Sequence, residues 1–464
     1  MGRILTIAHH TVREAVRMKV VMAFAVLILA LICGLPFGIQ RPSATVTATV
    51  QTFLTWSLTP LGVILSFLAV FLGCLSISDD MYHRQIYTLA SKPIPRWQYI
   101  IGKWVGVVQV LTGLLIFAGL LTYAMARLLA SAEPVDDFDK FALEHEVLTA
   151  RAHSPLFIPD FTARAERVLA QLKEEGRYAD ASAAAQRATK ARIAGEFSQR
   201  WRAIVPGEVR EFEFRGLGLV DRSRTKTMQL RYKAKGMGYA QDEVLQTQWI
   251  FGDPRDADVY QPDRRRDVMD RYHVIPFPAS CVSPNGVLKI GVQNLDHLRA
   301  EGHPGATIAF EAEEGFEVLY KIGSFEGNLA RTLFLIWCRV VLIASLAILS
   351  ATFLSYPVAC LLTFMFYVLS VSGGYVVDAL GFGGAQDGVY GAAKPFVKAM
   401  LEMVFWLLPK FSKYDGVATF VEGRNVTLMW DLLAFGKLVL FLSTIILLIA
   451  CIVFRRRQVA ELSV

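Results

Sequence analysis

The chain has 464 residues, of which 54% are hydrophobic and 19% are charged, and its formal net charge is +7. Soluble domains are about a quarter charged, so this composition favours a membrane protein. A net positive charge can also indicate nucleic-acid binding, but much of this charge lies beside apolar runs, where lysine and arginine set the orientation in a bilayer. We therefore expect a chain that contacts membrane lipid and binds no nucleic acid.

Six apolar runs are long enough to cross a bilayer, which takes about 18–20 residues. They lie at about 20–37, 55–77, 100–130, 333–354, 357–377 and 433–454. Before the first run, Ile4, Ala8 and Val12 recur on one face of a predicted amphipathic helix, which we expect to lie in the headgroup plane. Residues 132–328 have the composition of a soluble domain, so the chain is predicted to be polytopic with one large insert.

Basic residues predict how these segments are oriented. Lysine and arginine gather in residues 1–19, in the 78–103 loop and in the C-terminal tail, as cytoplasmic segments do. Six spans then place both termini in the cytoplasm and residues 132–328 outside the cell (inner) membrane. Residues 379–432 also carry five lysines and arginines. We interpret residues 394–414 as an outer re-entrant or interfacial segment, in which Pro409 ends a helix; a seventh crossing is the alternative.

The insert has two parts. Residues 132–208 are rich in helix-forming residues and are interrupted at Gly176, which predicts a helical hairpin. Residues 209–328 contain runs typical of a β-sandwich, namely VREFEF, TMQLRYKA, LQTQWIF, HVIPF, VLKIGV, ATIAFEA and FEVLYKI. PNGVLKIGVQNLD and IAFEAEEGFEVL resemble jelly-roll modules of the galactose-binding-like type. The predicted class is therefore a helical membrane protein, residues 1–131 and 329–464, with an inserted α+β domain.

Chemical motifs are scarce in the insert. The histidines form no HExxH pattern, no GxSxG occurs, and Cys281 is the insert's only cysteine, which leaves it without a disulfide partner. The DRRRD stretch at 263–267 is expected to be a solvated loop, although it could also bind an acidic partner. We expect a substrate-binding or docking module with no catalytic, metal or cofactor site.

The loop between the second and third runs reads ISDDMYHRQIYTLASKPIPRWQYIIGKW, residues 77–104. It resembles the cytoplasmic loop of type-2 ATP-binding-cassette (ABC) exporter permeases, especially the copper-enzyme-maturation and gliding group. The shared residues are Ser91, Lys92, Pro93, Ile94, Arg96, Tyr99, Gly102 and Lys103, after the acidic start at Asp79 and Asp80. Tyr87 stands where the family has glycine, which is a departure within the first half of the loop.

The resemblance implies the membrane subunit of an ATP-driven exporter. The chain has no GxxxxGK[ST] motif, so ATP and Mg are expected on a separate cytosolic ATPase subunit. A second permease chain, identical or related, is also implied. The residues that would contact the ATPase are Asp79, Asp80, Arg84, Lys92, Pro93, Arg96 and Tyr99. Lys92 and Arg96 could pair with anionic lipid instead, and only the resemblance favours the ATPase.

Elementary chemistry gives the end of this loop a second interpretation. Trp97, Tyr99 and Trp104 suit the headgroup layer, and Lys103 can extend its ammonium towards it. Gly102 forms a GxxxG pattern with Gly106, which allows another helix to approach closely.

Three ionisable residues fall inside or at the ends of apolar runs: Arg339, Asp378 and Lys437. Such residues are candidates for function. Arg339 and Asp378 could close an outer gate, and a structural pair or extension to the interface is the alternative. At the level of function, the rivals to an exporter subunit are a membrane-anchored scaffold or sensor that moves no solute and a membrane enzyme.

Overall fold

The computed structural model describes residues 2–39, 45–82, 95–175, 183–219, 226–237, 244–255, 257–296, 305–311, 315–380 and 409–456. The chain divides into two compact units. The first comprises Met1–Ala150 and Gly323–Val464, and the second comprises Arg151–Ile322. The predicted class is confirmed: the first unit is helical, with apolar helices of membrane-spanning length, and the second is rich in β-strands.

Six candidate membrane spans occur among the described residues, one at each predicted apolar run. They are α2 (Lys19–Ile39), α3 (Val46–Tyr82), α5 (Arg96–Ala130), α9 (Phe325–Phe353), α10 (Tyr356–Leu380), and a last helix made of α13 (Leu428–Ala434), the π-helical η6 (Phe435–Ser443) and α14 (Thr444–Arg456). Most are longer than the apolar run alone, because polar residues extend the helices beyond it.

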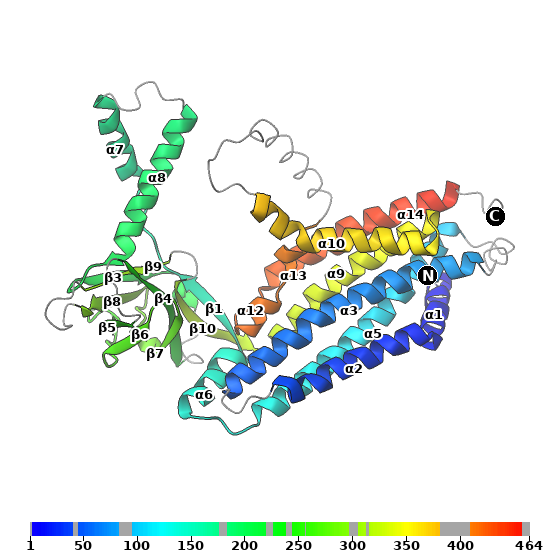
Figure 1. Cartoon of the computed structure of the whole chain (residues 1–464), viewed down its shortest axis with the longest axis horizontal. Coiled ribbons are helices and arrows are strands. Elements are labelled where there is room, and N and C mark those ends of the chain that lie inside the picture. The colour runs from blue at the N-terminus through cyan, green and yellow to red at the C-terminus, as the bar shows by residue number, and fades with distance from the viewer. Residues whose placement is uncertain are drawn as a thin grey trace. The chain divides into compact units, whose positions relative to one another are not determined.

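The long helix α3 forms the centre of the first unit, with α2, α5, α9 and α10 packed around it (Figure 1). The amphipathic helix α1 (Gly2–Arg17) packs along α5. Between α3 and α9 the approach is close, because a Cβ at Gly73 would lie 2.6 Å from the Cβ of Ala347. Helices α9 and α10 form a tight hairpin at Ser355.

Short elements join the spans. After α5 come α6 (Asp137–Ala142) and the π-helical η1 (Leu143–Val147). Before α13 come η5 (Phe411–Tyr414), which packs against α10 and α9, and α12 (Val417–Val421), which packs against α3 and α9. Most of the segment predicted at 394–414 lies outside the described residues.

The second unit contains the predicted helical pair, α7 (Thr162–Glu174) and α8 (Ala183–Arg202), which contact each other. It also contains two antiparallel sheets within the described residues. One has the order β1 (Thr149–Pro155), β10 (Phe316–Ser324), β4 (Thr227–Met237), β9 (Thr307–Phe310), β2 (Ala203–Ile204), with β7 (Tyr272–Pro278) also paired to β4. The other has the order β3 (Val209–Phe214), β8 (Leu288–Asn294), β5 (Val244–Phe251), β6 (Arg265–Val268).

Aromatic rings fill the core of this unit. Phe212, Trp249, Phe310 and Phe316 are all buried and lie in ring contact with one another, for example Phe310 with Phe316 at 4.4 Å between centroids. Cys281 is buried beside them, and burial raises the pKa of its thiol to about 11. All seven predicted runs form strands, and β1, β2 and β6 are additional.

The expectation of a solvated loop at 263–267 is wrong. Residues Arg265–Val268 form the edge strand β6, and Asp267 is buried. The Asp267 carboxylate accepts hydrogen bonds from the Tyr232 hydroxyl and from the Arg265 guanidinium. Burial and the neighbouring carboxylate raise the pKa of Tyr232, so its hydroxyl stays a donor. The local charge pattern could not reveal this partner, because Tyr232 lies on a distant strand.

Candidate functional site

Helix α1 reaches the start of α5 through two glycines. A Cβ at Gly102 would lie 2.7 Å from the Cβ of Ile7, and one at Gly106 would lie 2.8 Å from the carbonyl oxygen of Ala8. Real Cβ atoms do not approach other atoms so closely, so only glycine allows this contact. The GxxxG pattern therefore joins α5 to α1, and it brings Glu14 of α1 within reach of Lys103.

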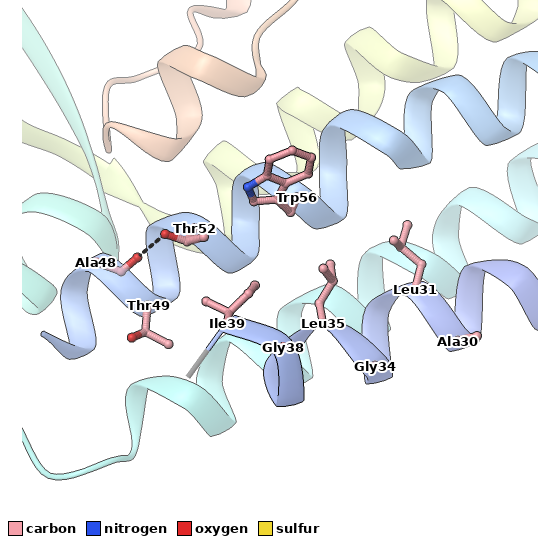
Figure 2. Close-up of a pocket in the computed structure, with 10 residues that line it drawn as sticks. All are labelled: Ala30, Leu31, Gly34, Leu35, Gly38, Ile39, Ala48, Thr49, Thr52 and Trp56. Carbon is pink, nitrogen blue, oxygen red and sulfur yellow. Dashed lines mark hydrogen bonds between the residues drawn. The ribbon is translucent and has the colours of Figure 1, made fainter. Parts of the chain in front are cut away.

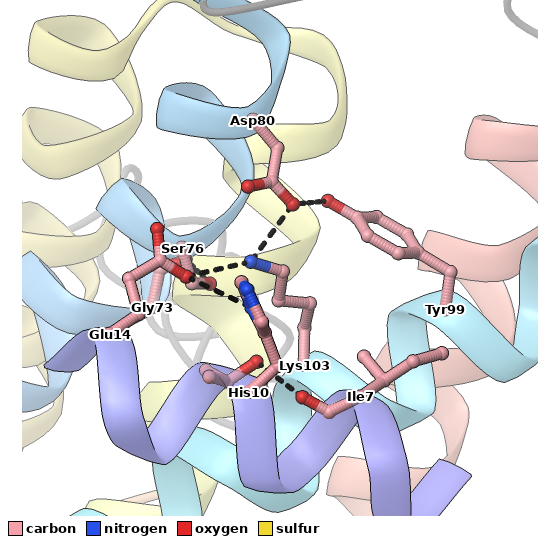
Figure 3. Close-up of polar contacts among 9 residues, drawn as sticks. Ile7, His10, Glu14, Gly73, Ser76, Asp80, Tyr99 and Lys103 are labelled. Carbon is pink, nitrogen blue, oxygen red and sulfur yellow. Dashed lines mark hydrogen bonds and ion pairs between the residues drawn. The ribbon is translucent and has the colours of Figure 1, made fainter. Parts of the chain in front are cut away.

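A buried lysine lies between two carboxylates at this junction (Figure 3). The Nζ atom of Lys103 is 2.8 Å from Oδ2 of Asp80 and 3.3 Å from Oε2 of Glu14. Only 3% of the Lys103 side chain is exposed. The Tyr99 hydroxyl donates a 2.5 Å hydrogen bond to the same Asp80 oxygen. Burying charges is costly unless each is paired and hydrogen-bonded, and this group satisfies both conditions.

The same residues connect to the last helix. The Tyr99 ring stacks on Phe454 of α14 with 5.6 Å between centroids. Arg96 donates to the carbonyl oxygens of Phe454 and Arg455, at 3.2 and 3.1 Å. A cation is favourable there, because the last carbonyls of a helix lack partners within it. We call Glu14, Asp80, Arg96, Tyr99 and Lys103 the charge cluster; it joins α1, α3, α5 and α14.

The charge cluster flanks residues 83–94. Asp79 and Asp80 lie in the last turn of α3, and Arg96 and Trp97 lie in the first turn of α5. Arg84, Lys92 and Pro93, the other predicted contact residues, lie outside the described part of the chain. The described residues therefore show the two helix ends that hold this segment.

Three of the residues assigned to the interface face the interior of the protein. Tyr99 and Lys103 are buried in the charge cluster, and the partly buried Trp104 donates from Nε1 to the Ser345 hydroxyl at 2.9 Å. They face inward because α1 and α9 cover this part of α5. Trp97 is 48% exposed, which fits the predicted position in the headgroup layer.

Glu14 and Phe454 were missed by sequence reasoning. Glu14 is the single acid among the basic residues of 1–19, and that isolation was the available signal. Phe454 is one of many apolar residues in its run, and nothing in the sequence distinguishes it.

The intramembrane charges do not form one site in the described residues. The Nη2 atom of Arg339 lies 3.8 Å from Oδ1 of Asp415, a residue that was not predicted as its partner. The side chain of Asp378 lies outside the described part. Lys437 is exposed on η6. No group of three or more His, Cys, Asp or Glu residues suited to a metal occurs among the described residues.

A groove of about 700 Å³ lies between α2 and α3 (Figure 2). It is lined by Ala30, Leu31, Gly34, Leu35, Gly38, Ile39, Ala48, Thr49, Thr52 and Trp56. The two threonine hydroxyls donate to their own helix, at Thr45 and Ala48 carbonyls, so they offer the groove little polarity. Its surface is apolar, as expected of helices that face lipid or other helices.

A comparison with known families bears on the N-terminal part of this membrane unit. Residues 5–150 match the family described as ABC-2 family transporter protein. This segment is similar to the ABC-2 transporter family. The match spans α1, α2, α3 and α5, and so contains every residue of the charge cluster. No curated protein matches the chain. An ABC-2 chain is a membrane permease subunit of an ABC transporter, so the predicted permease class is confirmed, while the copper-maturation and gliding group stays a prediction.

Proposed function

We propose that the chain is the permease subunit of an ATP-driven exporter, energised by a separate ATPase subunit that carries ATP and Mg. The ATPase binds the cytoplasmic ends of α3 and α5, and a second permease chain, identical or related, completes the transporter. The family match supports the permease role. The observation that carries the coupling assignment is the charge cluster, with Asp80, Tyr99 and Lys103 buried at its centre, at the two ends of residues 83–94.

The charge cluster suits a coupling element because it links four helices by strong contacts. Removing one partner from a buried ion pair costs about 3–5 kcal/mol, since it leaves the other charge uncompensated. A displacement of the segment between α3 and α5 therefore moves α1 and α14 along with them. Contacts of this strength transmit force from a cytosolic partner to the membrane helices.

The second unit, Arg151–Ile322, is inserted between the third and fourth spans. Because the 78–103 loop is assigned to the cytoplasm, we place this unit on the opposite, extracytoplasmic side of the membrane. There it receives the exported substrate or docks a partner. Its aromatic core and paired sheets make it a stable platform for either task.

Coupling is tested by co-expressing the chain with candidate ABC ATPase subunits from the same genome and measuring co-purification and permease-dependent ATP turnover. Asp80→Asn and Lys103→Met should each reduce turnover at least about tenfold, because the first leaves the buried Lys103 with only the partly exposed Glu14 and the second leaves the buried Asp80 without a cation. The exchange of charges, Asp80→Lys with Lys103→Asp, should restore part of it. Lys19→Met is the matched control, because Lys19 is an exposed lysine near the same helix ends.

The proposal fails if the wild-type chain retains no ATPase, or if the single variants keep full turnover. Coupled ATP turnover without efflux of any solute would instead support a scaffold or sensor.

A further inference from the structure

Arg339 lies at the midpoint of a membrane-spanning helix. It is fourteen residues from either end of α9, Phe325–Phe353. At a rise of 1.5 Å per residue, its Cα is about 21 Å from each end of the helix. A charged side chain at that depth is costly, and such residues usually mark a binding site or a path for ions or substrate.

The charge of Arg339 is only loosely compensated. Its Nη2 atom is 3.8 Å from Asp415, which is beyond hydrogen-bond distance. A guanidinium has five N–H donors, and it forms no hydrogen bond with the residues that the structure describes. The Asp415 carboxylate is itself 43% exposed, and it also accepts a hydrogen bond from the backbone N–H of Val417. The N–H donors of the Arg339 guanidinium can therefore bind another group.

A cavity of about 110 Å³ adjoins this guanidinium. Hydroxyl-bearing residues Thr59, Ser66 and Tyr367 help to line it. Gly62 lies beside the charge, since a Cβ there would be 3.8 Å from Nη2 of Arg339, an ordinary van der Waals contact. Water occupies about 30 Å³ per molecule in the liquid, so the space suits a group of the size of phosphate or carboxylate. We call it the Arg339 cavity.

The segment beside the cavity is not a continuous helix. Asp415 lies next to the middle of α9, whereas Arg424 and Val426 bond to Asn328 near its start, both at 2.8 Å. Residues 415–426 therefore run along half the length of α9. Irregular backbone at membrane depth is tolerated only where protein buries it or where it lines a wet cavity. Polar backbone thus accompanies the Arg339 cavity.

We propose that the Arg339 cavity binds the oxyanion of a phosphate group, carried either by a lipid headgroup or by a soluble phosphate. The planar guanidinium fork matches two oxyanion oxygens, and it is less strongly hydrated than an ammonium. Asp415 is the counter-ion that the phosphate displaces, since both compete for the same donors. This site is independent of the ATPase contact proposed above.

The test uses the purified full-length chain in a non-ionic detergent. Its thermal unfolding midpoint is titrated with inorganic phosphate at constant ionic strength, with chloride as the reference anion, and separately with phosphatidylglycerol in mixed micelles. A ligand that binds the folded state raises the midpoint saturably. A rise with inorganic phosphate identifies a soluble ligand, and a rise with the lipid alone identifies a headgroup.

Variants assign the effect to the site. Arg339→Gln should weaken the apparent affinity at least about tenfold, which is the loss of one charge-assisted hydrogen-bonded contact. Asp415→Asn should strengthen it, because it removes the competing carboxylate. Lys437→Gln, which removes an exposed charge from the last span, should leave it unchanged.

The proposal is overturned if neither phosphate nor the lipid stabilises the wild-type chain saturably, or if Arg339→Gln responds as the wild type does. If Arg339→Gln does not fold, the proposal is still tested by the wild-type titration and by whether Asp415→Asn strengthens or weakens the apparent affinity. A purely structural ion pair predicts no ligand response and a loss of stability in Asp415→Asn. No ATPase takes part, so a negative result here leaves the coupling proposal standing.

Discussion

At the scale of single residues, the close contact between α1 and α5 depends on glycines, which have no side chain at the point of contact. A Cβ at Gly106 would meet the Thr11 Cβ at 2.6 Å and the Ala8 carbonyl oxygen at 2.8 Å. Gly113 lies two turns further along the same helix, and a Cβ there has nothing within 4 Å. The two glycines differ only in what covers them.

Gly106→Ala is therefore expected to destabilise the chain. Overpacking a close contact costs about 1–3 kcal/mol, which exceeds the gain of about 1 kcal/mol from replacing glycine by alanine inside a helix. Gly113→Ala should be neutral or stabilising, because only the helix-propensity gain applies. Thermal unfolding of both variants in detergent micelles measures the difference. An equal effect of the two substitutions would contradict the contact between α1 and α5.

Residue patterns predicted that something approaches Gly102 and Gly106, but they did not identify it. A GxxxG pattern indicates that one face of a helix lacks side chains and can be approached closely. Which helix packs against that face depends on the fold. Lys103 shows the same limit. Beside an apolar run it is expected to extend to the headgroups, but two carboxylates on other helices hold it inside. The sequence shows charges, whereas packing determines their partners.

At the scale of elements, the beginning of α3 is capped from a distance. The first N–H groups of a helix have no partner within it. Here Val46 and Thr47 donate to the two carboxylate oxygens of Asp139, at 2.9 and 3.0 Å. Thr45 caps the next group, the N–H of Ala48, at 3.2 Å. Asp139 thus fixes α6, which follows the third span, to the start of the second.

Asp139→Asn should lower the free energy of unfolding by about 1–2 kcal/mol at neutral pH, as loss of a helix cap does. Burial opposes the charge of Asp139, but hydrogen bonds from Thr47, Val46 and Val135 outweigh it and lower the pKa of this carboxyl. The fold therefore favours the deprotonated form. Its stabilisation is fully present above the ordinary aspartate pKa of about 3.9 and is lost as the pH falls through the lower folded pKa.

Unfolding curves over a pH series check this dependence. The difference in the free energy of unfolding between wild type and Asp139→Asn should become smaller as the pH falls. Asp137→Asn, which changes an exposed residue of the same helix, should have the same pH dependence as the wild type. A gap that does not change with pH would show that the charge of Asp139 is irrelevant to the cap.

Elements with a strong local pattern were predictable, and elements that depend on a partner were not. The six spans follow from unbroken apolar runs, and strands such as VREFEF follow from alternation. β1 reads TARAHSP, which has neither alternation nor β-branched residues beyond its first, so its pairing with β10 determines its conformation. The Asp139 cap lies 93 residues from Val46, beyond any local pattern.

At the scale of the whole molecule, sidedness follows from the order of the spans. Residues 83–94 come after two spans, and the second unit comes after three. We therefore predict that the second unit lies across the membrane from the N-terminus. Residues 381–408 do not affect this prediction, because they come later in the chain. Lysine and arginine near the N-terminus and in the 78–103 loop predict that the N-terminal side is the cytoplasm.

Cysteine labelling can test this arrangement with one thiol on each side. Val259→Cys places a thiol at a 48% exposed position of the second unit, and Tyr82→Cys places one at an 83% exposed position at the end of α3. The partly exposed Cys33, Cys360 and Cys451 are first replaced by serine or alanine, while the other three natural cysteines are buried.

A membrane-impermeant maleimide should label only Val259→Cys in intact cells, because the bilayer shields Tyr82→Cys from the reagent. In inside-out vesicles the result should reverse, and after detergent solubilisation both thiols should react. Labelling of both from the same side would mean that α5, the apolar helix between the two thiols, does not cross the membrane. Reversed labelling of the pair would keep the α5 crossing but place the second unit in the cytoplasm, and the ATPase contact would then have to be sought at the opposite helix ends.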